Sequence, residues 1–189
     1  MARDAEVIDA VLRGDIERYA ELVQRYQAAA WALAYRFLGN WEDAKDASQN
    51  GFVKAYQSLG RFRGDAKFST WLYRIIVNEC QDAYKRNARV RADSLDASDD
   101  AGELLFDVPD SSGDVLRQRE LARSLQRALS RLASHQRTAF ILHHLHGLSI
   151  GEAASVMGCR EGTVKTHLFR ACARLREELA GLWKSEAGA

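Results

Sequence analysis

Residues 149–158 read SIGEAASVMG, and this stretch decides how the second half of the chain folds. Ser149 and Glu152 have the spacing of a capping box, in which the serine hydroxyl and the glutamate carboxylate each satisfy a backbone N–H at a helix start. We expect a short helix over residues 151–157 that ends at Gly158, because glycine readily adopts the left-handed conformation that closes a helix. A second helix is expected over residues 161–179. The pattern therefore predicts a helix-turn-helix.

The second of these helices has two unlike faces. Apolar side chains recur three or four residues apart on one face, at Val164, Leu168, Ala171, Leu175 and Leu179. The opposite face carries Lys165, Thr166, Phe169 and Arg170. In a helix docked into the major groove, an arginine can bond guanine and an apolar group can touch the thymine methyl. An ordinary solvated face is the alternative, but the capping box, the turn glycine and the local basic charge favour DNA binding.

The net charge of +1 conceals three segments of different character. Residues 1–90 carry a net +2, residues 91–115 a net −7 and residues 116–189 a net +6. The middle segment holds the only proline, Pro109, is rich in Ser, Asp and Gly, and has no helical period, which is typical of a linker. We therefore predict two helical domains, 1–90 and 116–189, joined by an acidic linker over 91–115. The basic second domain suggests a polyanionic partner.

The first domain is also predicted to be all-α. Apolar spacing indicates helices over residues 15–38 and 43–59 and from Ser69 onward, with a short leading helix over 7–13. Asp15 is the expected N-cap of the first long helix, and Gly39 the expected stop. In the second domain, the leucines at 121, 125, 129 and 132 predict one stripe, and residues 135–146 another helix.

A loop over residues 60–67 and the helix after it combine rings with cations. The rings are Phe62, Phe68, Trp71 and Tyr73, interleaved with Arg61, Arg63, Lys67 and Arg74. Residues two apart on a helix point about 200° apart, so Trp71 and Tyr73 cannot both face the core. Exposed rings among cations stack on unpaired bases. On composition alone, rings that anchor the core and the loop are the better interpretation.

Other classes of protein find little support in the sequence. The longest apolar run, residues 28–35, is far short of the roughly 18–20 residues that span a membrane, and the N-terminus has no signal-peptide pattern. Three cysteines at wide spacing indicate reduced thiols in the cytoplasm, with redox sensing by Cys159 or Cys172 the lesser alternative. Helix geometry argues against a metal site built on His143, His144, His146 and Cys159, because residues 143, 144 and 146 point in different directions, and no enzyme motif occurs. We expect that the chain binds no cofactor and is not an enzyme.

Several motifs in sequence order resemble the extracytoplasmic-function (ECF) group of the sigma-70 family of transcription initiation factors. They are DAKDASQ at 43–49, Phe52, FRGD at 62–65, FSTWLYRI at 68–75, Asn78 and GTVKTHLFRA at 162–171. The resemblance covers roughly residues 5–90 and 116–180. It implies an all-α fold with a region 2 and a region 4, without the additional domains of housekeeping sigma factors.

The resemblance also implies a division of roles. Region 2 would bind the clamp helices of the RNA polymerase β′ subunit through Asp46, Gln49 and Phe52. It would hold and melt the −10 element through Lys54, Phe62, Asp65, Phe68, Trp71, Tyr73 and Asn78, which favours the stacking interpretation of the rings. Region 4 would contact the β flap and read the −35 element through Lys165, Thr166, Phe169 and Arg170. An anti-sigma factor is a further implied partner. At Asn50 and Gly51 the sequence departs from residues common in the family, and His167 stands where arginine is common.

The linker is long enough for this role. The two promoter elements lie roughly 55 Å apart, about one and a half duplex turns. A chain of this length reaches at most about 80–90 Å when extended, so it can span the gap, and we expect polymerase to hold it stretched. The rival function is a helix-turn-helix regulator that does not act as a polymerase subunit, which leaves Asp46, Gln49 and the aromatic loop without a role.

Overall fold

The computed structural model describes residues 2–93 and 114–186 of the chain. Every regular element within these two ranges is helical. The first half contains α1 (Ala2–Leu12), η1 (Ile16–Arg18), α2 (Tyr19–Leu38), α3 (Trp41–Gln57), η2 (Leu59–Arg61) and α4 (Phe68–Asp93). The second half contains α5 (Asp114–Ser130), α6 (Ser134–Phe140), η3 (Ile141–Leu145), α7 (Ile150–Met157) and α8 (Glu161–Glu186). The all-α prediction is confirmed. Residues 94–113, most of the predicted linker, lie outside the described residues.

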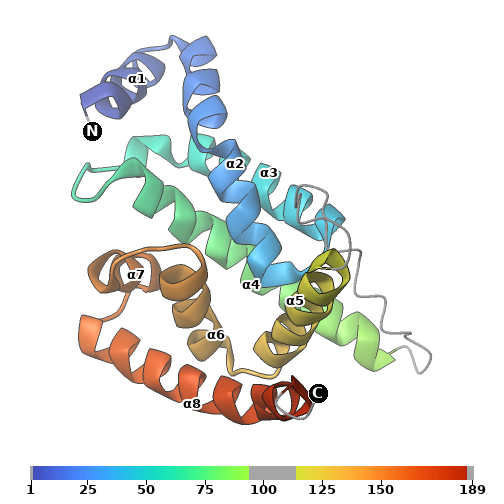
Figure 1. The fold of residues 1–189 in the computed structure, drawn as a ribbon. Coiled ribbons are helices and arrows are strands. Elements are labelled where there is room, and N and C mark those ends of the chain that lie inside the picture. The colour runs from blue at the N-terminus through green and yellow to red at the C-terminus, as the bar shows by residue number, and fades with distance from the viewer. Residues whose placement is uncertain (1, 94–113, 187–189) are drawn as a thin grey trace.

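The first half is a bundle in which α2, α3 and α4 pack against one another, with α1 against α2 (Figure 1). Its core is formed by apolar side chains at helical spacing, including Leu22, Leu33, Ala44, Leu72 and Ile76, none of which exposes any surface. Gly39 ends α2 with a φ of 76° and its N–H donates to Tyr35. This is the stop predicted from the sequence, since a left-handed residue after the last turn closes a helix.

The start of α2 differs from the sequence-based prediction. The Asp15 side chain makes no capping hydrogen bond, and the short η1 turn intervenes before α2 begins at Tyr19. The side chain of Asn40 instead caps the next helix, α3, by accepting from the Asp43 N–H at 2.7 Å. An aspartate upstream of an apolar stripe is thus insufficient evidence for a cap, because the chain can first pass through a turn of 3-10 helix.

In the second half, α5, α6 and α7 pack against the long α8. Leu129 and Leu132 are buried as the leucine stripe predicts, whereas Leu121, earlier on the same face of α5, is 59% exposed, so the start of the stripe is not part of the core. The helix predicted over 135–146 is divided into α6 and the π-helical η3, which shifts the phase of the side chains that follow.

The two halves are not separate bodies on a tether. α4 packs along α7 (Figure 1), and α2 contacts η3. One continuous core contains Leu72 and Val77 from the first half together with Leu142, Ala153 and Val164 from the second. The sequence predicted both helical groups but not this direct packing between them.

Gly51 occupies a close approach between α3 and α4. It is buried, and a Cβ built on it would lie 2.6 Å from Cγ1 of the fully buried Ile76. We expect Gly51→Ala to lower the free energy of unfolding by roughly 1 kcal/mol, because the overpacking cost of about 1–3 kcal/mol exceeds the helix-propensity gain of about 1 kcal/mol. Urea unfolding of both proteins measures the change. Gly162→Ala, at a helical glycine with no neighbour within 4 Å, is the matched control and should stabilise instead.

Candidate nucleic-acid and polymerase interfaces

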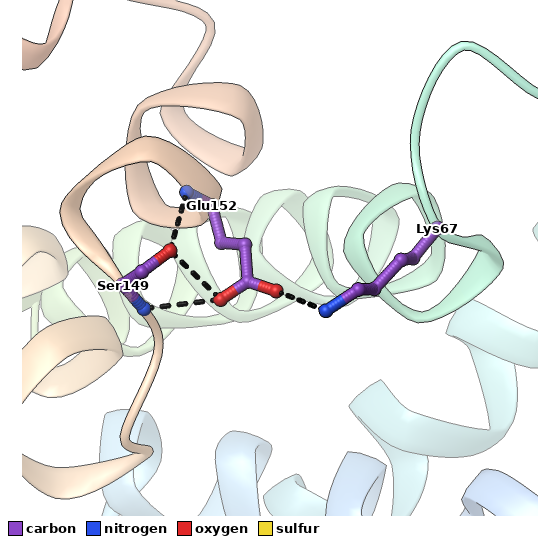
Figure 2. Close-up of polar contacts among 3 residues, drawn as sticks. All are labelled: Lys67, Ser149 and Glu152. Carbon is purple, nitrogen blue, oxygen red and sulfur yellow. Dashed lines mark hydrogen bonds and ion pairs between the residues drawn. The ribbon is translucent and has the colours of Figure 1, made fainter.

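The helix-turn-helix is built by the capping box that the sequence predicts. The Ser149 hydroxyl accepts from the Glu152 N–H at 3.2 Å, and the Glu152 carboxylate accepts from the Ser149 N–H at 3.1 Å (Figure 2). Gly158 ends α7 with a φ of 65°. The turn that follows leads directly into α8. Both ends of α7 are therefore set by local interactions.

The outward face of α8 has the composition expected of a DNA-reading helix. Lys165, Thr166, Phe169 and Arg170 are all exposed, while Val164 and Ala171 on the other side expose no surface. Phe169 is 77% exposed, the largest exposure among the large apolar side chains described. The Thr166 hydroxyl donates to the Gly162 carbonyl at 2.9 Å, so only its acceptor lone pairs face outward.

His167 lies to the side of this face. Its ring stacks on that of His135 in α6, with centroids 5.6 Å apart. Partial burial, followed by the nearby His135 and Arg170, lowers the pKa of His167, so the ring is neutral at physiological pH. It therefore contributes packing rather than charge where the family commonly has arginine.

The surface of α3 contains the residues assigned to polymerase binding. Asp46 and Gln49 are exposed, whereas Phe52 is only 8% exposed and belongs to the core. The structure adds two residues that the sequence analysis missed, because Val53 and Tyr56 are exposed and lie on the same helical face as Asp46 and Gln49. Exposed apolar side chains beside polar ones on one face are common at protein interfaces. In the sequence, the only signal was their spacing of seven and ten residues from Asp46.

The aromatic loop is a packed cluster rather than an open platform. Phe68 is 2% exposed and contacts the half-buried rings of Phe62 and Trp71 at centroid distances of 5.7 Å each. Phe62 and Trp71 also contact each other at 5.3 Å. An exposed platform of all four rings is therefore not formed in this structure, and only Phe62 and Trp71 offer partly accessible faces.

Tyr73 is buried by the second half of the chain. It is 8% exposed, and its ring meets the His146 ring edge-on with centroids 4.8 Å apart. Burial, with a smaller contribution from the negative charge of Glu152, raises the pKa of Tyr73. The sequence rule that Trp71 and Tyr73 face apart holds, but the face that carries Tyr73 is covered.

A polar cleft between α3 and α4 collects other residues assigned to the −10 element. Lys54 and Asn78 line it together with Gln57, Ser58 and Arg61, and its volume is about 520 Å³. Lys54 forms an ion pair with Glu79 within the cleft. Asp65 lies outside it, in the exposed loop, where it pairs with Arg63 at 3.3 Å. Gln57 and Ser58 were not predicted as site residues because nothing in their local pattern distinguishes them from a solvated helix end.

Glu152 links the two halves through a second interaction. Lys67 lies in the loop that precedes α4, and its Nζ donates a hydrogen bond to the Glu152 carboxylate at 2.8 Å (Figure 2). The bond from Lys67 and those from the backbone and hydroxyl of Ser149 hold the pKa of Glu152 at about 2. The same residue therefore caps the helix-turn-helix and contacts the loop that precedes α4.

The histidines and cysteines do not converge. His143 Nδ1 contacts the Leu148 carbonyl at 2.8 Å, His144 Nε2 lies 3.7 Å from Cys172 Sγ, and Nδ1 of His146 faces Arg36 at 3.1 Å. Within residues 2–93 and 114–186 no three metal-ligating side chains gather. Burial raises the pKa of the Cys80 thiol to about 12, which leaves almost no thiolate. No helix in the described ranges is long and apolar enough to cross a membrane.

Comparison with known proteins gives matches over both halves. The family model for Sigma-70 region 2 matches residues 22–90, and that for Sigma-70, region 4 matches residues 122–175. The RNA polymerase sigma-H factor of Pseudomonas aeruginosa is 35% identical over 174 residues, which cover 89% of this chain and 90% of the relative. The ECF RNA polymerase sigma factor SigM of Mycobacterium tuberculosis is 37% identical over 179 residues, covering 95% and 86%.

Solved structures agree with these matches. The structure of CnrH in complex with the cytosolic domain of CnrY superposes with a TM-score of 0.67 at 27% identity, covering 93% of this chain and 96% of that one. The sigma factor RpoE in complex with the anti-sigma factor NepR, from Bartonella quintana, gives a TM-score of 0.65 at 26% identity, covering 86% and 96%.

A region 2 bundle followed by a region 4 helix-turn-helix defines a sigma-70-type transcription initiation factor. The chain belongs to the sigma-70 family, in its ECF group.

Proposed function

We propose that the chain binds the RNA polymerase core and directs initiation at promoters through region 2, within residues 1–90, and region 4, within residues 116–189. Residues 91–115 act as the connecting linker. Region 4 reads the −35 element and region 2 opens the −10 element. The chain supplies no catalytic group of its own, since the polymerase carries out the chemistry.

The observation that carries this proposal is the exposed face of α8. A phenylalanine that is 77% exposed, beside an exposed lysine and an exposed arginine, has no packing role in the described structure. In the major groove, Arg170 can bond a guanine, Phe169 can touch a thymine methyl and Lys165 can neutralise a phosphate. Thr166 adds a hydroxyl acceptor. We assign these four side chains to the −35 element.

In region 2, we assign Asp46, Gln49, Val53 and Tyr56 to the clamp helices of the β′ subunit. Phe52 positions this surface from the core beneath it. Lys54 and Asn78, in the polar cleft, and Asp65, in the loop, are assigned to the −10 strand. Phe62 and Trp71 offer rings for stacking, Phe68 supports both from the core, and Tyr73 contributes once region 4 has moved away. Stacking a base on an aromatic side chain contributes about 1–3 kcal/mol.

We also propose an anti-sigma factor as a partner and the cytoplasm as the location. Two structural relatives support such a partner, because the CnrH and RpoE structures contain CnrY and the anti-sigma factor NepR, respectively. Region 4 would contact the β flap of the polymerase. A DNA-binding regulator without polymerase contact explains α8 but leaves the α3 surface without a partner.

Binding of purified core polymerase tests the proposal directly. We expect the chain to bind core and to support transcription in vitro from a promoter library. The double substitution Asp46→Ala and Gln49→Ala should weaken core binding about tenfold or more, because hydrogen bonds to charged groups contribute about 1.5–3 kcal/mol. Asp9→Ala, an exposed carboxylate on α1, is the charge-matched control. A chain that binds DNA but not core would support the regulator instead.

A further inference from the structure

Region 4 contains a cavity with a mostly apolar wall, formed by side chains of α5, α6 and α8. Its volume is about 600 Å³. The wall includes the hydrocarbon side chains of Leu125, Phe140, Leu175 and Leu179, and it also includes Cys172 and Arg176. The size and lining are those of a site for a small apolar molecule, in which a few polar groups fix the orientation.

Cys172 has a histidine beside it. Its Sγ lies 3.7 Å from Nε2 of His144 in η3, which is within hydrogen-bonding distance for sulfur. The ring of Phe140 packs against the ring of His144, with centroids 4.9 Å apart. Partial burial, followed by the neighbouring His143, lowers the pKa of His144, so the ring is neutral near pH 7. When Nδ1 holds the ring proton, Nε2 can accept the thiol proton as the sulfur attacks an electrophile.

Arg176 brings a positive charge to the same cavity. It follows Cys172 by four residues on α8, so the two side chains lie on one face of the helix. A guanidinium donates hydrogen bonds and never accepts them. It is therefore suited to stabilise a carbonyl oxygen on which negative charge develops. The cavity thus combines a nucleophile, a base, a cation and an apolar wall.

We propose that Cys172 is a modification site, at which region 4 captures small apolar α,β-unsaturated carbonyl compounds as thioethers. Sγ forms a bond to the β-carbon, and the π electrons of the carbon–carbon double bond move toward the carbonyl oxygen beside Arg176. His144 takes the thiol proton, and the α-carbon then receives a proton. All atoms of both reactants remain in the product, so the addition needs no oxidant and releases no leaving group. The site does not depend on the proposed function, because neither polymerase nor DNA takes part.

The other two cysteines lack this combination and serve as internal controls. Cys80 exposes no surface, so it should react only if the chain unfolds. Cys159 is partly exposed in the turn between α7 and α8, and it packs against the main apolar core. Within the described ranges the Cys159 thiol makes no side-chain hydrogen bond. Its reactivity therefore represents an accessible thiol without a base.

Two maleimides test the proposal in the full chain. N-methylmaleimide and N-hexylmaleimide share one reactive ring, but only the second carries a hydrocarbon chain long enough to contact the apolar wall. We expect N-hexylmaleimide to modify Cys172 at least about tenfold faster, because each buried CH₂ gives roughly a fourfold preference. The two rates at Cys159 should agree within about threefold. Peptide mass spectrometry measures each thiol separately, and an unmodified Cys80 shows that the chain has stayed folded.

His144→Gln tests the base. Glutamine can accept a hydrogen bond from the thiol but does not take its proton. We expect the rate at Cys172 to fall about tenfold, less than the factor of about 10²–10⁴ in enzymes, because the ring of His144 is exposed. The rate at Cys159 should not change. His143→Gln is the matched control, because it removes a neighbouring ring and keeps the base, so the rate at Cys172 should stay within about threefold.

The pH dependence of the original chain is a second measurement, which needs no variant. An unassisted thiol reacts as its thiolate, so its rate rises nearly tenfold per pH unit below about pH 8. We expect this slope at Cys159. At Cys172 the rate should change less than about threefold between pH 6.5 and 7.5, because neutral His144 takes the proton during the attack. The groups that face this thiol are His144, with His143 beside it, and Arg176, while the side chains that α5 and α6 contribute to the wall are uncharged.

The possible results separate clearly. Equal rates and equal pH slopes at Cys172 and Cys159 would overturn the proposal and make Cys172 an ordinary surface thiol. A preference for N-hexylmaleimide at both thiols would indicate general adsorption of the probe and would also overturn it. If His144→Gln made Cys80 reactive, the variant would be unfolded and the pH slope of the original chain would decide. A preference confined to Cys172, together with the shallow slope, supports the capture site.

Discussion

Arg170→Ala is expected to weaken binding of the polymerase-bound chain to its −35 duplex by roughly 5- to 150-fold. A bidentate arginine–guanine contact contributes about 1–3 kcal/mol of discrimination, which corresponds to that range. Because the proposed contact of Arg170 is with a base edge, the loss should fall on one position of the element and relax the preference there. The measurement is binding to duplexes selected from a random library, repeated with each base substituted in turn.

Lys165→Ala provides the contrast that makes the assignment testable. A lysine on a phosphate contributes affinity without sequence information, so the loss should be similar for all duplexes and should reduce the salt slope by about one. Arg13→Ala removes one exposed positive charge from region 2 and serves as the charge control. If Arg170→Ala weakened all sequences equally and lowered the salt slope, Arg170 would be a phosphate contact and the base assignment would be wrong.

The sequence predicts region 4 well because the signals there are local. The capping box at Ser149 and Glu152 and the left-handed Gly158 involve residues within one helical turn, and the apolar stripe of α8 repeats at a spacing of three or four residues. Local propensity and tertiary packing agree at these positions. The same reasoning fails at Asp15, where a turn of 3-10 helix precedes α2 and the side chain caps nothing. It also fails at Leu121, which has the spacing of a core residue but is left exposed.

What the sequence could not predict is which side of α4 is covered. Trp71 and Tyr73 must face apart, but the choice between them depends on the docking of α7 and η3, which lie more than 60 residues away. Gly51 is a similar case, because its role depends on how closely Ile76 approaches from α4. Contacts of high sequence separation leave no periodic trace.

Acid is expected to separate the two docked halves of the chain through protonation of His146. Arg36 on α2 faces Nδ1 of this ring at 3.1 Å and Tyr73 on α4 packs on its edge. Since an arginine can only donate, Nδ1 must be an unprotonated acceptor when the domains are docked. Burial, with a further contribution from the charge of Arg36, lowers the pKa of His146 from 6.5 to about 4. Protonation is therefore opposed by docking.

The direction of the pH effect follows from these two values. Well above pH 6.5 the ring of His146 is neutral whether the two halves are docked or apart, and docking has its full stability. As the pH falls from 6.5 toward 4, the ring of His146 binds a proton when the two halves are apart but not when they are docked. The equilibrium constant for docking therefore falls by at most about tenfold per pH unit. Partial exposure of the ring makes this an upper bound. Small-angle scattering between about pH 7.5 and 5 should show the chain expanding.

His146→Gln separates this effect from general acid denaturation. Glutamine keeps a neutral acceptor for Arg36 but cannot titrate. The two halves of the variant should therefore stay docked, and the chain compact, over the same pH range. The ion pair of Glu152 with Lys67 does not interfere, because the pKa of Glu152 is held at about 2 and its carboxylate stays charged throughout. If both chains expanded alike, the opening would come from other carboxylates. If neither did, the docked ring would not be a determinant of closure, and the contact of Arg36 with His146 would add only packing.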